Sequence, residues 1–486
     1  MNARPAVTAT AGSTPPTIDI VSAMNDKALF EPWFPGATWD GWRAVLKAAF
    51  ALPMTAAEVE FFRSVAERDP PTRKVKELWL ICGRRAGKDS IASAICAHAA
   101  ALFSEGDRLR PGERALAMLL ASDRDQARIV LGYVRSYFTD IPMLRAMVQR
   151  ETATGVELSN NVDIAISTNS FRAVRGRPIL CAILDEISFW QDENSANPDE
   201  EVLTAIKPAL ASLPGSMVIG ISSPYRKKGL LYNKFRKHFG KDGDVLVIRA
   251  ATRQLNPTIP QEIVDEAIEE DAAKARAEWI AEFRDDVGGW LPAELVEQAV
   301  DRGLTVRPRA THRTVHYTSF CDPSGGARDS FTCAIAHQEN SIGVLDCVLE
   351  IRAPFNSISA TQQISDLLKS YGVTTTVGDK YAAQWVVDAF ASFGVRYQHS
   401  ERDRSAIYSD CAPLFTSGRV KLLDNKRLVS QFASLERRTH PSGRDRVDHG
   451  PGGSDDVANS VAGALVRAIH EPAQGSRRVF VNFMGR

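Results

Sequence analysis

A lysine follows a glycine-containing turn at the end of an apolar run, in the segment Cys82-Gly83-Arg84-Arg85-Ala86-Gly87-Lys88-Asp89-Ser90. Such a turn between a strand and a helix presents backbone N–H groups and the positive end of the helix dipole to an anion. Residues 83–90 would therefore surround the phosphates of ATP, with Lys88 reaching the β- and γ-phosphates. The spacing departs from a strict P-loop, because Cys82 replaces a glycine and Asp89 replaces the usual Ser or Thr. The Mg²⁺ ligand is either Asp89 or Ser90.

A pair of carboxylates ends a second apolar run. Ile179–Leu184 is apolar throughout, as in the central strand of a parallel sheet, and Asp185-Glu186 follows it. In an ATPase, Asp185 would bind Mg²⁺ and Glu186 would activate the attacking water. A strand that ends in a solvated acidic turn gives the same pattern, but the order after Lys88 favours nucleotide hydrolysis.

Hydroxyls and arginines add to this candidate ATP site. The strand-like run before Ser222-Ser223-Pro224 places two hydroxyls where they could sense the γ-phosphate and couple hydrolysis to movement. A guanidinium can stabilise the charge on the transferring phosphoryl group. Arg84, inside the loop, is one candidate, and Arg175 is the candidate finger supplied to a neighbouring subunit. Solvent-facing or DNA-facing roles remain alternatives for these arginines.

Carboxylates at the ends of predicted elements give the second half of the chain a different chemistry. Asp322 ends a strand-like run, Asp379 ends another, and Asp455 and Asp456 open a helix-like segment. Three separated acids can bind two Mg²⁺ or Mn²⁺ ions, which activate water and stabilise the leaving oxygen of a phosphodiester. Asp322, Asp379 and Asp456 are the core set, although the sequence does not decide between Asp455 and Asp456. Each acid alone could cap a helix or mark a turn.

Several neighbouring residues are secondary candidates. Asp329 is a reserve metal ligand, and His449 could assist catalysis or be an ordinary loop residue. Lys380, Arg444 and Arg446 could contact a phosphate backbone, although a solvated surface explains them equally well.

Alternating strand-like and helix-length segments predict an α/β fold. The expected strands are Leu78–Cys82, Ala115–Ser122, Asp163–Thr168, Ile179–Leu184 and Met217–Ile221, with helices at Ser90–Phe103 and Gln126–Phe138. Ligands in such a sheet bind at the carboxyl ends of the strands. The prediction is an N-terminal P-loop (ASCE/RecA-like) ATPase domain with a parallel-rich sheet, followed by a C-terminal ribonuclease H-like nuclease domain.

Composition changes along the chain suggest five parts. They are a disordered segment (1–25), the ATPase domain (26–254), a helical linker subdomain (255–305), the nuclease domain (306–470) and a C-terminal tail (471–486). The aromatic group at Trp33, Phe34, Trp39 and Trp42 could stack on adenine, but core packing is favoured.

Overall charge and cysteine content restrict the class of protein. The 486 residues carry 59 basic and 59 acidic side chains, so any contact with DNA depends on local basic patches. The seven cysteines are odd in number and contain no CxxC pair, which indicates reduced thiols. No apolar stretch reaches transmembrane length, and the N-terminus lacks a signal pattern. We therefore expect a cytosolic protein with no membrane association.

The combination of motifs resembles the large terminase subunit of tailed bacteriophages, which packages and cuts viral DNA. The matching segments are residues 83–88, Ile183-Leu184-Asp185-Glu186, Ser222-Ser223-Pro224 and the acids at 322, 379 and 455–456. The resemblance implies a ring of identical subunits at the portal that uses ATP to drive double-stranded DNA into a procapsid. It also implies cutting of concatemeric DNA at initiation and completion. The partners would be the portal protein and a small terminase subunit, and the location would be the host cytoplasm and, transiently, the portal vertex.

Two other classes compete with this interpretation. An ATP-dependent helicase or restriction-type translocase fused to a nuclease would also need an ATP site and carboxylates. A helicase should carry a second RecA-like domain with its own arginine motifs, whereas residues 310–470 carry acids at strand ends. A scaffolding protein with decayed sites would not be expected to keep Lys88, Glu186 and all the nuclease acids.

Overall fold

The chain divides into two compact units in the computed structural model. The first contains residues 1–190 and 199–283, and the second contains residues 191–198 and 284–486. The structure describes residues 18–122, 124–168, 176–190, 198–311, 315–380, 384–439, 445–451 and 453–470. The expected tail at 471–486 and the candidate finger Arg175 lie outside these ranges.

In the described part of the first unit, an eight-stranded sheet has the order β3-β4-β5-β2-β6-β7-β1-β8. The strands are β1 (Glu77–Cys82), β2 (Ala115–Ala121), β3 (Val148–Thr152), β4 (Gly155–Leu158), β5 (Val162–Thr168), β6 (Ile179–Asp185), β7 (Met217–Ser222) and β8 (Val245–Ala250). From β5 to β8 all neighbours are parallel, and the antiparallel pair β3–β4 extends one edge. The predicted parallel-rich sheet is confirmed, with β3, β4 and β8 as strands that the sequence analysis did not identify.

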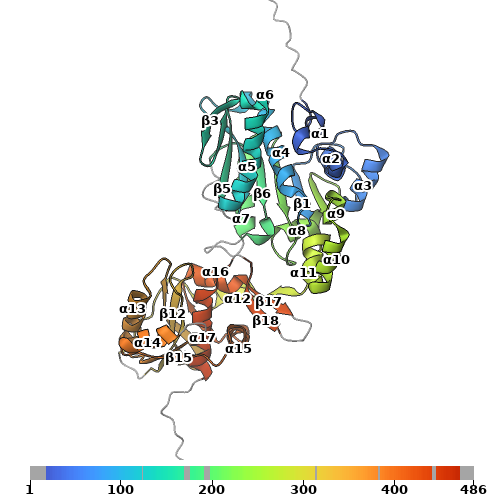
Figure 1. Ribbon diagram of the computed structural model, residues 1–486. Coiled ribbons are helices and arrows are strands. Elements are labelled where there is room, and N and C mark those ends of the chain that lie inside the picture. The colour runs from blue at the N-terminus through green and yellow to red at the C-terminus, as the bar shows by residue number, and fades with distance from the viewer. Residues whose placement is uncertain are drawn as a thin grey trace, which may run out of the picture. The chain divides into compact units, whose positions relative to one another are not determined.

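Helices cover both faces of this sheet (Figure 1). The helices of this unit are α1 (Ile20–Asn25), α2 (Asp40–Ala49), α3 (Ala56–Ala66), α4 (Lys88–Ala101), α5 (Arg124–Asp140), α6 (Pro142–Arg145), α7 (Pro198–Leu210), α8 (Leu230–His238), α9 (Thr252–Leu255), α10 (Gln261–Glu270) and α11 (Ala272–Ile280). Side chains of β1 alternate between two cores. Leu78 and Leu80 pack with α2–α5, whereas Trp79 and Ile81 pack with α7 and α8. This burial on both faces explains why the strands are continuously apolar.

The N-terminal boundary differs from the expectation of disorder through residue 25. Helix α1 is capped by Asp19, whose side chain accepts hydrogen bonds from Val21 N and Ser22 N, both at 2.9 Å. Ile20 and Met24 lie fully buried in the core beside α2–α5. The prediction of disorder is therefore wrong for residues 20–25, because two apolar side chains one turn apart anchor this short helix.

The predicted linker subdomain at 255–305 is not one separate unit. Its first part, α10 and α11, belongs to the first unit, and the division falls between Phe283 and Arg284. Its second part, with Trp290 and Val296, packs into the core of the second unit. The charged, Ala-rich composition of this region therefore hides two short segments that attach to different cores.

In the described part of the second unit, the larger sheet has the order β10-β16-β13-β12-β11-β14-β15, and β18-β17-β9 form a small antiparallel sheet. Strands β11–β13 are antiparallel, while β14 and β15 run parallel to β11, an arrangement typical of a ribonuclease H-like fold. The strands are β9 (Val287–Gly289), β10 (Val300–Asp301), β11 (Tyr317–Asp322), β12 (Phe331–Glu339), β13 (Ile342–Ile351), β14 (Thr375–Gly378), β15 (Arg396–His399), β16 (Val420–Leu423), β17 (Leu435–Thr439) and β18 (Asp445–His449).

The helices of the second unit include α17, which packs directly on β11 and β12. A Cβ atom added at Gly463 would lie 2.3 Å from Cγ of Phe320, so only glycine permits this approach. The approach places the N-terminus of α17, with its acids, beside the end of β11. The helices are α12 (Ala293–Gln298), α13 (Ser357–Ser370), α14 (Gln384–Ser392), α15 (Arg404–Thr416), α16 (Lys426–Ser434) and α17 (Asp456–His470).

The thiols are buried throughout both units. All seven cysteines are free and buried, in agreement with the expectation of reduced thiols. Burial raises the pKa of Cys82 and of Cys181 to about 12, so the reactive thiolate form is disfavoured.

Candidate functional site

The phosphate loop lies between β1 and α4, as predicted. Strand β1 ends at Cys82, and α4 begins at Lys88 after Gly87, which has a φ of +89°. Two tryptophan side chains contact the loop and support it. Trp42 Nε1 donates a buried hydrogen bond to Ala86 O at 2.7 Å, and a Cβ atom at Gly87 would lie 2.8 Å from the Trp39 ring. These tryptophans therefore support the loop, in line with the favoured packing role.

The structure brings Lys88 and the acids after β6 together. Lys88 Nζ lies 2.5 Å from Glu186 Oε1 and 3.1 Å from Asp89 Oδ1. Burial opposes the charge on Lys88, but the charges of Glu186, Asp185 and Asp89 outweigh it and raise the pKa of the ammonium above its usual value. Lys88 is therefore a cation surrounded by carboxylates. A positive charge at this position suits the binding of a triphosphate.

Asp185 fits the expected role of a Mg²⁺ ligand. Its Oδ1 atom is buried and has no hydrogen-bond partner within the described residues, which is costly for a carboxylate. Burial raises the pKa of Asp185 to about 7, although the Lys88 charge acts in the opposite direction. A divalent ion would satisfy the unpaired oxygen, and oxygen ligands suit Mg²⁺. Asp89 and Ser90 both lie on the first turn of α4, so they remain alternative ligands.

The hydroxyl after β7 contacts the proposed catalytic glutamate. Ser222 Oγ donates to Glu186 Oε2 at 3.0 Å, and Ser188 N donates to Ser222 Oγ at 3.3 Å. Ser223 Oγ is buried without a partner within the described residues. Glu186 adopts a left-handed backbone, with φ of +49°, a strained conformation that the surrounding contacts must maintain. A change at Glu186 can therefore reach the Ser222–Pro224 segment directly.

A set of contacts that the sequence analysis missed holds the phosphate loop from the side of α9–α11. Thr252 Oγ1 donates to Arg84 O, and Asn256 Nδ2 donates to Arg85 O, both at 2.7 Å. A Cβ atom at Gly83 would lie 2.2 Å from Thr252 Oγ1, which explains the glycine at this position. No motif marks these residues, since they bond to backbone carbonyls far away in the sequence.

The arginine candidates differ in their surroundings. Arg84 pairs with Glu278, with Nη1 3.3 Å from Oε1, and its side chain is 63% exposed, so it can turn toward a ligand. Arg177 Nη2 contacts Asp163 Oδ2 at 2.6 Å, which indicates a structural role.

In the second unit, Arg404 joins three of the four candidate acids. Its Nη1 lies 2.8 Å from Asp455 Oδ1, and its Nη2 lies 3.7 Å from Asp379 Oδ2 and 3.9 Å from Asp322 Oδ2. The carboxylates at the ends of β11 and β14 and before α17 therefore surround one guanidinium. The structure thus brings Asp322 and Asp379 of the predicted core set together with Asp455 around Arg404, and their role as metal ligands stays a prediction.

Asp456 contacts a different set of groups. Its Oδ2 accepts hydrogen bonds from Ser330 N at 3.2 Å and from Ser454 Oγ at 3.1 Å. Asp455 Oδ2 accepts from Tyr408 OH at 2.8 Å. Burial, with smaller contributions from the charges of Asp456 and Asp455, raises the pKa of Asp322 to about 7, although Arg404 and the hydrogen bond from Asn459 act in the opposite direction. Both Asp455 and Asp456 thus remain candidates for a metal ligand.

The donor set of this cluster suits hard divalent ions. Burial raises the pKa of Asp455 and of Asp456, so their negative charges are destabilised without nearby cations. Asn459 Nδ2 donates to Asp322 Oδ2 at 2.8 Å, while its own Oδ1 is buried without a partner within the described residues. Carboxylate oxygens are the ligands that Mg²⁺ and Mn²⁺ prefer. When bound, such ions would activate water and stabilise a leaving oxygen.

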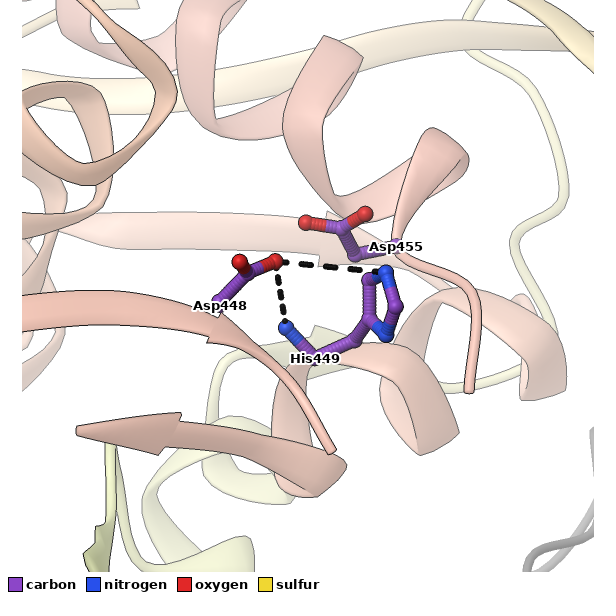
Figure 2. A group of neighbouring side chains, drawn as sticks. All are labelled: Asp448, His449 and Asp455. Atoms are coloured by element: carbon purple, nitrogen blue, oxygen red, sulfur yellow. Dashed lines mark hydrogen bonds and ion pairs between the residues drawn. The ribbon is translucent and has the colours of Figure 1, made fainter. Parts of the chain in front are cut away.

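His449 lies beside Asp448 and Asp455, as Figure 2 shows. The possible ligand atoms of Asp448, His449 and Asp455 lie within 4.8 Å of one another. His449 Nδ1 lies 2.9 Å from Gly450 O, and its Nε2 lies 3.9 Å from Asp448 Oδ1. The histidine is thus close enough to Asp455 to act beside the cluster.

The remaining secondary candidates lie at the periphery. Asp329 O accepts from Ser324 Oγ at 2.8 Å, and Arg446 pairs with Asp448 at 2.9 Å. Arg444 lies outside the described residues. Of the residues that sequence reasoning missed, Asn459 carried a signal, because it lies one helical turn after Asp455–Asp456 and so on the same side of α17.

Comparisons of the sequence with protein families and with curated proteins give two results. A family model described as the N-terminal P-loop domain of the uncharacterized protein MJ0330 matches residues 54–280. No curated protein matches the chain in sequence. Among the described helices, none is long and apolar enough to cross a membrane.

Several solved structures are similar to this chain. The large terminase of bacteriophage HK97 is 14% identical, with a TM-score of 0.36 over 88% of this chain and 99% of that chain. A large terminase from a thermophilic bacteriophage, solved in complex with ADP, is 11% identical, with a TM-score of 0.36 over 81% of this chain and 94% of that chain. The large terminase nuclease of thermophilic phage G20c with bound magnesium is 14% identical, with a TM-score of 0.29 over 36% of this chain and 96% of that chain.

Proposed function

We propose that this chain is the large terminase subunit of a tailed bacteriophage, a DNA-packaging ATPase with its own nuclease. ATP hydrolysis in a ring of identical subunits at the portal vertex drives double-stranded DNA into the procapsid. The nuclease cuts concatemeric DNA when packaging begins and when it ends. The partners are the portal protein and a small terminase subunit, and the protein acts in the cytoplasm of the infected bacterium.

One observation carries the proposal, namely that one polypeptide contains two acid-bearing centres of different design. In the first unit, Lys88 lies 2.5 Å from Glu186 and next to Asp185, the set that binds and hydrolyses ATP. In the second unit, Asp322 and Asp379 converge on Arg404 with Asp455. A protein that both translocates DNA and cuts it needs an ATPase site and a nuclease site, and candidates for both lie in this one chain.

The ATP site contains the residues for each part of phosphoryl transfer. Lys88 and the backbone of residues 83–88 would bind the phosphates, and Asp185 would hold Mg²⁺ together with Asp89 or Ser90. Glu186 orients the attacking water once the nucleotide draws Lys88 away from it. The hydrogen bond of 3.0 Å between Ser222 Oγ and Glu186 Oε2 transmits a change at Glu186 to the Ser222–Pro224 segment. Arg84 or Arg175 supplies the cation for the transition state.

The helicase alternative has less support from the second unit. Its β11–β13 strands are antiparallel, candidate acids lie at the ends of β11 and β14, and Asp455 directly precedes Asp456, the first residue of α17. A second RecA-like domain would instead present another parallel sheet with nucleotide-contacting arginines. This observation favours the nuclease assignment over a helicase with two motor domains.

Filling of capsids tests the proposed function. Purified protein, procapsids of the cognate phage, linear double-stranded DNA and ATP are combined, and DNA that survives added nuclease is measured. The native chain and the surface control Glu60→Gln, at an exposed glutamate of α3, should protect DNA, whereas Glu186→Gln should protect none. A protein that separates DNA strands but never fills shells would instead be the helicase.

A further inference from the structure

Arg404 occupies the centre of the acid cluster for a local structural reason. It is the first residue of α15, and the preceding Asp403 caps this helix by accepting a hydrogen bond from Ala406 N at 2.8 Å. The cap fixes the backbone at the helix start, so the long Arg404 side chain extends from a rigid point. Its two terminal nitrogens then reach acids from three elements that are far apart in the sequence.

The positive charge of Arg404 offsets the repulsion among the three neighbouring carboxylates. Asp322, Asp379 and Asp455 each contribute a carboxylate oxygen at 2.8–3.9 Å from the guanidinium. Burial opposes the charge of Arg404, but Asp455 and Asp322 outweigh it and raise the pKa of the guanidinium further, so it stays a cation. Without this cation the buried acids would repel one another or take up protons.

The carboxylates that Arg404 contacts are also candidate ligands of divalent ions. Asp455 Oδ1 is bonded to Arg404 at 2.8 Å, and Asp455 Oδ2 is bonded to Tyr408 at 2.8 Å, so neither oxygen is free. The guanidinium and a divalent ion are both cations, so they repel each other and compete for the negative charge of the same carboxylates. The Arg404 side chain is 33% exposed, which gives it a route toward solvent when an ion enters.

We propose that Arg404 is a positioning residue that competes with divalent ions for Asp322, Asp379 and Asp455, and so sets the ion concentration at which the nuclease becomes active. In the metal-free protein it replaces the ions as the counter-charge and keeps the three carboxylates together. On metal binding it leaves this position. The inference rests on the proposed nuclease, but it makes a separate claim about metal affinity.

Binding of Mn²⁺ to the full-length protein tests this inference by isothermal titration calorimetry. Every protein carries Asp185→Asn, so that the ATP site contributes no ion binding. Arg404→Gln should bind Mn²⁺ about tenfold more tightly or better, because a competing charge at 2.8 Å has been removed. The matched control is Arg402→Gln, two residues earlier, whose side chain pairs with Asp410 at 3.2 Å outside the cluster. The control should bind Mn²⁺ as the parent does.

Thermal unfolding provides a second measurement. Without metal, Arg404→Gln should melt below the parent, and saturating Mn²⁺ should remove most of the difference. Should Arg404→Gln fail to fold, Arg404→Lys takes its place, and it should show an intermediate gain in affinity, since it keeps the charge but loses the planar fork. Equal or weaker Mn²⁺ binding by the Arg404 variants would overturn the inference.

Asp379→Asn separates this inference from the proposed function. If Asp379→Asn weakens Mn²⁺ binding and the Arg404 variants leave it unchanged, the nuclease site stands and the role of Arg404 is rejected. If Mn²⁺ binds equally well without the Asp379 carboxylate, the nuclease assignment itself fails, and the claim about Arg404 fails with it.

Discussion

Replacing Thr252 by valine removes one hydrogen bond that supports the phosphate loop while it keeps the shape of the side chain. Thr252 is fully buried, and its Oγ1 donates to Arg84 O at 2.7 Å. A net contribution of about 1 kcal/mol for the bond, with the cost of a partly desolvated carbonyl, gives a total of about 1–2 kcal/mol. The loop then loses its prearranged conformation, and nucleotide binding must restore it.

This loss should appear in nucleotide affinity. A difference of 1–2 kcal/mol corresponds to roughly 5–30-fold in the Kd for ATP, because 1.4 kcal/mol is tenfold. A fluorescent ATP analogue titrated against the full-length protein measures it. The matched control is Thr361→Val in α13 of the second unit, where Thr361 is also fully buried but Oγ1 donates to Ser357 O of its own helix. The reasoning is refuted if Thr252→Val binds nucleotide within twofold of the parent while folding normally.

Three further substitutions probe the sites and the packing that positions them. Glu186→Gln should abolish ATP turnover while Mn²⁺-dependent nicking of plasmid DNA persists, and Asp379→Asn should do the reverse; loss of both activities in either variant would contradict two independent centres. Gly463→Ala should cost about 1–3 kcal/mol of stability, because its Cβ atom would lie 2.3 Å from Phe320, and thermal unfolding measures this cost. Its control, Gly132→Ala in α5, has open space at that Cβ position and should stabilise slightly, and similar melting of both variants would contradict the close packing of α17 on β11.

The residues of the proposed ATP site could largely be identified from the sequence, because they belong to short linear motifs. Lys88 follows a buried strand within a few residues, and Asp185-Glu186 lies at the end of another buried strand. The residue types and the preceding hydrophobic runs therefore identify both motifs. The contacts from Thr252 and Asn256 were not predictable. Each donates to a main-chain carbonyl 168 or 171 residues away, and a carbonyl leaves no mark on the sequence.

In the proposed nuclease site, the convergence of the acids could be predicted from the sequence, but the contacts of Arg404 could not. Asp322 and Asp379 follow parallel neighbouring strands, so their convergence follows from sheet geometry. Arg404 contacts Asp455 across 51 residues, and it begins an ordinary helix with no apolar strand before it to draw attention. The disordered-segment boundary failed for a related reason, since the buried contacts of Ile20 and Met24 depend on partners that only folding brings near.

The concealment of every native thiol has a practical benefit for studying motion in this molecule. A cysteine introduced at an exposed position would be the single site open to a maleimide dye, since the seven natural sulfhydryls are shielded from reagents. Pairs of fluorophores could therefore be attached to the native background without first deleting any cysteine. Energy transfer between a dye on each unit would then report, in real time, any change in the distance between the two dyes.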